Sequence, residues 1–103
     1  MSDPESVSGM LIVAGHLEVA PADRDAYVAE CVPVVEAARR ADGCLEFSIT
    51  ADSVDSGLIQ IYERWASEEQ LLAFRSDGPS GDQRAKILDA DMKRYGISSV
   101  GAP

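Results

Sequence analysis

The order of elements in the sequence predicts an α+β fold in which helices cover one face of a four-stranded antiparallel sheet. Residues 44–51 and 58–65 alternate like strands on either side of a polar turn, so they are predicted to form a hairpin. A helical segment links each of them to a further strand, residues 10–19 before the hairpin and residues 92–100 after it. One right-handed crossover in each half gives the ferredoxin-like β-α-β-β-α-β sandwich, with the first and third strands at its centre.

The chain is predicted to begin with a strand and to continue as a kinked helix. One face of the first strand carries Leu11, Val13, Gly15, Leu17 and Val19. Pro21 suits a helix start, and apolar residues then recur at helical spacing as far as Ala38. Pro33 lacks a backbone N–H and is therefore expected to kink this helix, which Asp42-Gly43 ends. The following strand is predicted to bury Leu45, Phe47 and Ile49 and to expose Glu46, Ser48 and Thr50.

The third strand leads directly into a short helix. Ile59, Ile61, Glu63 and Trp65 share one face of this strand, and Leu58, Gln60, Tyr62 and Arg64 share the other. The period changes at Ser67, which is spaced to form a capping box with Gln70. Leu71, Leu72 and Phe74 give the helix an apolar side, and Asp77-Gly78-Pro79 ends it. A second capping box, Ser80 with Gln83, predicts another helix that includes Ala85, Ile87 and Leu88.

Length and charge limit the classes of protein to consider. The 103 residues fit one domain, residues 10–100, with a disordered tail at 1–9 and a frayed end at 101–103. The formal net charge of −9 argues against nucleic acid or an anionic membrane as a partner. No apolar run approaches the ~20 residues of a membrane span, and no signal-peptide pattern is visible, so a cytoplasmic location is expected.

The two cysteines, Cys31 and Cys44, are expected to be small free thiols. They do not form a Cys-x-x-Cys pair, and the chain lacks the further ligands that a zinc site needs. The sequence also contains no recognisable motif for a cofactor, so neither a cofactor site nor a metal site is predicted.

Three groups of residues resemble the antibiotic biosynthesis monooxygenase (ABM) domain family, whose members are dimeric α+β barrels. These groups are Gly43 with Phe47, then Tyr62-Glu63-Arg64-Trp65, and finally Ser67-Glu68-Glu69-Gln70-Leu71 with Ala73. The resemblance extends over roughly Met10 to Val100. It implies an enzyme that oxidises a quinol, an anthrone or a similar electron-rich aromatic compound with molecular oxygen and without a cofactor.

The sequence departs from the family pattern at three positions. Many members carry a histidine in the short helix, where this chain has Phe74. The haem-degrading branch carries an asparagine on the first strand, which matches Gly15, and a histidine near Gln83. The missing helix histidine favours an alternative function, a non-catalytic binding or assembly module on the same barrel. Haem binding or degradation is a weaker third hypothesis.

Trp65 and Glu63 are the candidate catalytic residues. An indole offers a stacking face and one N–H donor, and a half-buried carboxylate beside it can act as a base. The structural alternatives are a core tryptophan and an ion pair between Glu63 and an arginine across the sheet. Phe74, Leu71 and Tyr95 are predicted to contact the substrate, with Tyr95 as a phenol donor. His16 is expected at a surface or an interface.

The first and third strands also predict a homodimer. Met10, Ile12 and Ala14 fall on the sheet face that the helices leave open, and Leu58 and Tyr62 join them from the third strand. Monomers rarely expose a contiguous apolar patch, so a second copy is expected to cover it.

Overall fold

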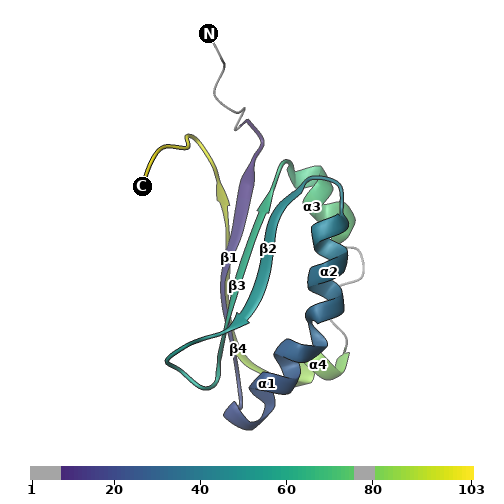
Figure 1. The fold of residues 1–103 in the computed structure, drawn as a ribbon, viewed down its shortest axis with the longest axis vertical. Helices are drawn as coiled ribbons and strands as arrows, with labels where there is room; N and C mark the ends of the chain where they lie inside the picture. Colours follow the sequence, from purple (N-terminus) through teal and green to yellow (C-terminus); the bar gives the residue numbers. More distant parts are fainter. Residues whose placement is uncertain (1–7, 76–80) are drawn as a thin grey trace.

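The predicted α+β fold is present in a computed structural model of the chain, which describes residues 8–75 and 81–103 (Figure 1). The elements in chain order are β1 (Leu11–Val19), α1 (Pro21–Glu30), α2 (Val32–Arg40), β2 (Cys44–Ala51), β3 (Leu58–Trp65), α3 (Glu68–Phe74), α4 (Gly81–Lys86) and β4 (Ile87–Gly96). The strands form one antiparallel sheet in the order β2-β3-β1-β4, which confirms the ferredoxin-like sandwich and its central strands β1 and β3.

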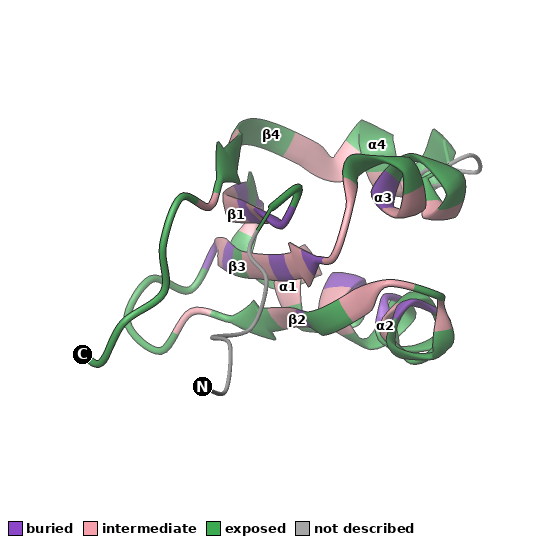
Figure 2. Ribbon diagram, turned by 90° about the horizontal axis from the view of Figure 1, so that it is seen from above, coloured by how far each residue is buried: buried purple, intermediate pink, exposed green. Residues whose placement is uncertain are grey.

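The helices lie together on one side of the sheet, as the view from above shows (Figure 2). Two groups of buried side chains fill the space between the layers. One contains Leu11, Val13, Ala38, Phe47, Trp65 and Leu71, and the other contains Leu17, Val19, Tyr27, Cys31 and Ile59. The first group lies at the end of the sheet where β3 passes into α3, and it therefore holds most of the candidate site.

The helix that follows β1 is broken at Cys31, two residues before the proline that was expected to kink it. The Cys31 amide still bonds to the carbonyls of Tyr27 and Val28, at 3.2 and 3.1 Å. Pro33 then occupies the first turn of α2, where its missing N–H costs no hydrogen bond. The predicted kink is confirmed, and it takes the form of a complete break between two helices.

Two boundary predictions were wrong because strand pairing overrides local pattern. The last strand begins at Ile87 and ends at Gly96, so Ile87 and Leu88 are not helical and the strand does not extend to Val100. Ile87 pairs with Val19 across a register shift and packs against the second buried group. A register shift between Cys44 and Glu46 likewise leaves Leu45 unpaired and 40% exposed. The Asp77-Gly78-Pro79 stop and Ser80 of the second capping box lie outside the described residues.

Candidate active site

Trp65, at the end of β3, is fully buried beneath α3. Its relative exposure is 0%, and it pairs with Leu11 of β1 and Cys44 of β2 in the sheet. Leu71 of α3 is also 0% exposed and belongs to the same buried group. Trp65 is therefore buried like a core tryptophan, which was the structural alternative. Any role in binding requires movement of the residues that cover the indole.

Phe74 covers the indole from α3. Its ring centroid lies 5.5 Å from that of Trp65, at an interplanar angle of 34°. It also meets Phe47 of β2 edge-on, at 5.8 Å and 71°. These distances are typical of favourable aromatic pairs. The Phe74 ring therefore packs against both aromatic side chains and closes the space above the indole.

Glu63 is a buried carboxylate with two charged or polar partners. It is 6% exposed, and by strand alternation it lies on the same face as Trp65. The Trp65 Nε1–H donates to Glu63 Oε1 at 3.0 Å. Arg75 Nη2 lies 3.4 Å from Glu63 Oε2. The ion pair foreseen as an alternative therefore exists, but its arginine comes from the end of α3 and not from across the sheet.

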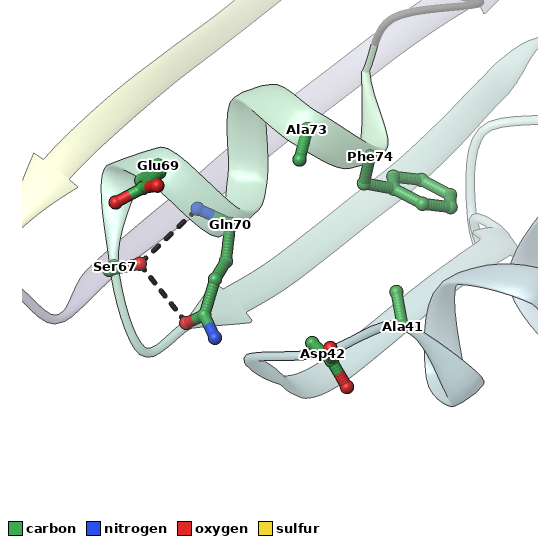
Figure 3. Close-up of a pocket in the computed structure, with 7 residues that line it drawn as sticks. All are labelled: Ala41, Asp42, Ser67, Glu69, Gln70, Ala73 and Phe74. Carbon is green, nitrogen blue, oxygen red and sulfur yellow. Dashed lines mark hydrogen bonds between the residues drawn. The ribbon is translucent and has the colours of Figure 1, made fainter.

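The start of α3 fixes the position of these groups. Ser67 Oγ accepts a hydrogen bond from the Gln70 amide at 3.2 Å and donates one to Gln70 Oε1 at 3.0 Å (Figure 3). The predicted cap is confirmed in its first bond, which satisfies an orphan amide of the helix. In a full capping box the Gln70 side chain would accept a hydrogen bond from the backbone N–H of Ser67. Here it accepts from the Ser67 hydroxyl instead. With its first turn anchored, α3 carries Leu71, Phe74 and Arg75 over the sheet.

Tyr95 does not lie where it was predicted. It pairs with Ile12 of β1 and therefore lies on the open face of the sheet, opposite Trp65, with 51% of its surface exposed. Arg94 occupies the corresponding place on the helix side and forms an ion pair with Glu68 of α3 at 3.4 Å. The sheet register decides this difference, because a shift of one residue moves a side chain to the other face. His16 is half-buried on the same open face as Tyr95, as predicted.

Two hollows border this region. The larger has a volume of about 580 Å³ and lies between α3 and the turn after α2 (Figure 3). Its lining consists of Ala41, Asp42, Ser67, Glu69, Gln70, Ala73 and Phe74. The smaller, of about 330 Å³, follows the edge of β2 from Cys44 to Ser48, beside Arg39. Trp65 lines neither hollow, and Phe74 separates it from the larger one.

Both cysteines are free thiols, as predicted. Burial, and secondly the negative charge of Glu63, raises the pKa of the Cys44 thiol. Burial also raises the pKa of Cys31, whose sulfur accepts a hydrogen bond from Gln83 Nε2 at 3.5 Å. Residues 8–75 and 81–103 contain no group of three or more side chains placed to hold a metal ion. No helix in these ranges is long and apolar enough to cross a membrane.

Comparisons with known proteins agree with this fold. The family model for antibiotic biosynthesis monooxygenase matches residues 10–82. A solved structure from Pseudomonas aeruginosa is similar with a TM-score of 0.79 and 20% identity, over 91% of this chain and 99% of that chain. Candidate antibiotic biosynthesis monooxygenases from Chloroflexus aurantiacus and Deinococcus radiodurans have TM-scores of 0.69 and 0.72 and identities of 26% and 17%. Each of these two alignments covers 90% of this chain and 97% of the other. No curated protein sequence matches the chain.

Proposed function

Because the chain belongs to the antibiotic biosynthesis monooxygenase family, we propose that it oxidises a quinol, an anthrone or a similar electron-rich aromatic compound with molecular oxygen. The observation that carries the proposal is the buried Glu63 carboxylate, which is joined to the indole of Trp65 and to Arg75. An acid–base group held against an aromatic face inside an apolar layer is what such chemistry requires.

For an anthrone, the reaction converts the ring CH₂ into a carbonyl. Loss of a proton from its phenol tautomer gives an anion, which passes one electron to O₂. The radical and the superoxide combine into a peroxide anion, which takes back the proton removed in the first step, and the resulting hydroperoxide eliminates water. One oxygen atom enters the product, and the other leaves with the two hydrogens of the CH₂ group. The protein needs only to accept the proton, orient the ring and exclude water, so the proposed reaction uses no flavin, haem or metal.

The larger hollow is the proposed entry for the substrate. Its volume of about 580 Å³ lies within the range of roughly 300–1,000 Å³ typical of small-molecule sites. Phe74 belongs both to its lining and to the aromatic group around Trp65. A change in the Phe74 side-chain rotamer would open a path from the hollow to the Trp65 indole, whose N–H is bonded to Glu63, and the displaced phenyl ring would stack on the entering aromatic ligand.

A non-catalytic binding module is the second candidate function. The observation that favours it is the Phe74 ring, which fills the position of the family histidine and packs on Trp65. The haem alternative has less support. At Gly15, which matches the asparagine of the haem-degrading branch, an added Cβ would lie 1.9 Å from the carbonyl oxygen of Asp91. A backbone atom cannot yield as the end of a side chain can, so β1 has no room there for a side chain.

We also propose that the working unit is a homodimer joined through the open faces of its two sheets. Ile12, Ala14, Leu58 and Tyr62 lie on that face, on the two central strands. They are half-buried in the single chain, and a second copy would remove the remaining apolar surface from water.

Oxygen uptake by metal-free protein tests the enzymatic proposal against a panel of quinols and anthrones. We expect uptake with at least one compound, unchanged by chelators, and a loss of about 100-fold or more in Glu63→Gln, the usual range for removal of a general base. The matched control is Glu68→Gln, which removes a carboxylate from an exposed ion pair. Absence of uptake from the whole panel, with aromatic ligands still bound, would favour the binding module. Activity that depends on a co-purifying flavin or metal would contradict the cofactor-free mechanism.

A further inference from the structure

The ion pair between Glu63 and Arg75 joins a buried carboxylate to a half-exposed guanidinium. The Glu63 side chain is 8% exposed and that of Arg75 is 44% exposed. Their separation of 3.4 Å exceeds the roughly 2.7–2.9 Å of a tight charge-assisted hydrogen bond. Among the described residues, Glu63 is the only group to which Arg75 donates a hydrogen bond. A guanidinium carries several N–H donors, and within residues 8–75 and 81–103 Glu63 uses only one of those on Arg75, so Arg75 has further donors to offer a ligand.

From this arrangement we infer that Arg75 transfers from Glu63 to the oxyanion of the substrate, and so selects ligands that carry an acidic hydroxyl. The O–H bond of the ligand breaks, and a new O–H bond forms at Glu63 Oε2, the oxygen that Arg75 leaves. The electron pair stays on the ligand oxygen, which becomes the new partner of Arg75. The total charge of the three groups does not change, so no uncompensated charge is created in the apolar layer.

The neighbouring groups fit this exchange. Trp65 donates to the other oxygen, Oε1, and can hold the carboxyl group in place while Oε2 takes the proton. On either side of Glu63 the sheet presents uncharged residues, Val13 of β1 and Phe47 of β2. Burial and then the charge of Glu63 raise the pKa of the nearby Cys44 thiol, which is therefore a weak competitor for the negative charge.

The other cations near this end of the sheet have partners of their own. Arg39 Nε donates to the carbonyl of Phe47 at 2.9 Å. Arg94 pairs with the exposed Glu68 at 3.4 Å, the same distance as in the Arg75 pair. Arg94 therefore provides a matched control. It also forms an ion pair with a glutamate, but the side chain of that residue, Glu68 of α3, is 58% exposed.

This inference rests on the proposed function, because it assumes a ligand with an acidic hydroxyl, but its test measures binding and not oxidation. Calorimetry compares 4-nitrophenolate with its methyl ether, 4-nitroanisole, at a pH at which the free phenol is ionised. Titrations in two buffers of different ionisation enthalpy count the protons taken up. We expect the phenolate to bind more tightly than the ether, with uptake of about one proton by Glu63. Glu63→Gln should bind with no proton uptake.

The arginine variants identify the cation. Arg75→Gln should lose about 10- to 100-fold in affinity for the phenolate, the usual effect of removing a charge-assisted hydrogen bond, and should bind the ether as the parent does. Arg94→Gln should change neither affinity, and Arg75→Lys should recover part of the loss.

Equal losses in the Arg75 and Arg94 variants would overturn the inference, because they indicate a general charge effect. The inference is also overturned if the unmodified protein takes up no proton on binding the phenolate, or if it binds the ether more tightly than the phenolate. Oxygen uptake without an Arg75 effect rejects this inference alone, whereas an Arg75 effect without oxygen uptake rejects only the oxygenase.

Discussion

Trp65 combines a packing role with a single hydrogen bond, and two substitutions separate them. Trp65→Ala should lower the free energy of unfolding by about 3–5 kcal/mol, because the indole is 0% exposed and lies in the main buried group. Trp65→Phe keeps an aromatic ring but removes the donor to Glu63, so we expect a loss dominated by that bond, about 1.5–3 kcal/mol. Urea denaturation followed by circular dichroism measures both. A Phe variant as unstable as the Ala variant would contradict the separation.

Cys44 reports the charge on Glu63. A raised pKa means less reactive thiolate at a given pH, and the negative charge of Glu63 is the second cause of the raised value after burial. Glu63→Gln removes that charge, so the pKa of Cys44 should fall and its alkylation by iodoacetamide at pH values below the pKa should become faster. Mass spectrometry of the labelled peptide distinguishes it from the buried Cys31, whose labelling should not change. An unaltered rate at Cys44 would show that Glu63 does not carry its charge near the thiol.

The sequence predicted which candidate residues lie close together better than it predicted how their side chains pack. Alternation along β3 correctly placed Glu63 and Trp65 on one face, and the capping signal at Ser67 placed Leu71 and Phe74 above them. Whether these side chains line a cavity or close it depends on tertiary packing, which a pattern does not contain. Arg75 was missed for the same reason. Its contact with Glu63 depends on how the last turn of α3 lies over the sheet.

At the scale of elements, the turn between α2 and β2 depends on one glycine. Gly43 has a φ of +83°, and an added Cβ would lie 2.0 Å from Oε1 of Gln70. Gly43→Ala should therefore cost about 1–2 kcal/mol for the left-handed backbone alone, and more because Gln70 must leave Ser67. In Gly43→Ala combined with Gln70→Ala, the clash with the amide end of Gln70 is removed, so part of the extra cost should be recovered; the backbone cost remains, with a close contact of 2.7 Å between the added Cβ and the Cβ of residue 70. Thermal unfolding measures the series, with Gly96→Ala as the control because, apart from the adjoining residues, no atom of the described part of the chain lies within 4 Å of its added Cβ. Equal stability of the Gly43 and Gly96 variants would contradict the role of the turn.

Local signals predicted the elements that local chemistry determines. Pro33 marked the break between α1 and α2, and Ser67 marked the start of α3, because each acts through its own backbone neighbours. The start of β4 had no such signal. Ile87 is in a strand because it pairs with Val19, far away in the sequence, and packs on the second buried group. Leu45 was misplaced for a similar reason, since the register shift beside it arises from pairing with β3.

At the scale of the whole molecule, the open face of the sheet has an unusual composition for a surface. Met10, which was expected there, is already buried within the chain at 7% exposure. Ile12 and Ala14 of β1 lie across from Arg64 and Tyr62 of β3. The Arg64 side chain reaches only Glu46, at 3.9 Å, and its buried Nε has no hydrogen-bond partner within the part of the chain that the structure describes. Because that Nε is already covered within the single chain, the case for a partner rests on the half-buried apolar residues of this face, which a surface supplied by another molecule would cover.

The last prediction is that a second copy of the chain supplies that surface. A two-fold axis over β1 and β3 would pair each apolar patch with its equivalent. Sedimentation at micromolar concentration should therefore give a mass near twice 11.0 kDa. Ile12→Asp should give a monomer or an aggregate, because the interface would then bury two carboxylates close together. Leu72→Asp is the control, since it places the same charge on the helix layer at a residue that is 54% exposed. It should remain a dimer. A parent protein that sediments at 11.0 kDa would refute the proposal, as would equal dissociation of the two variants.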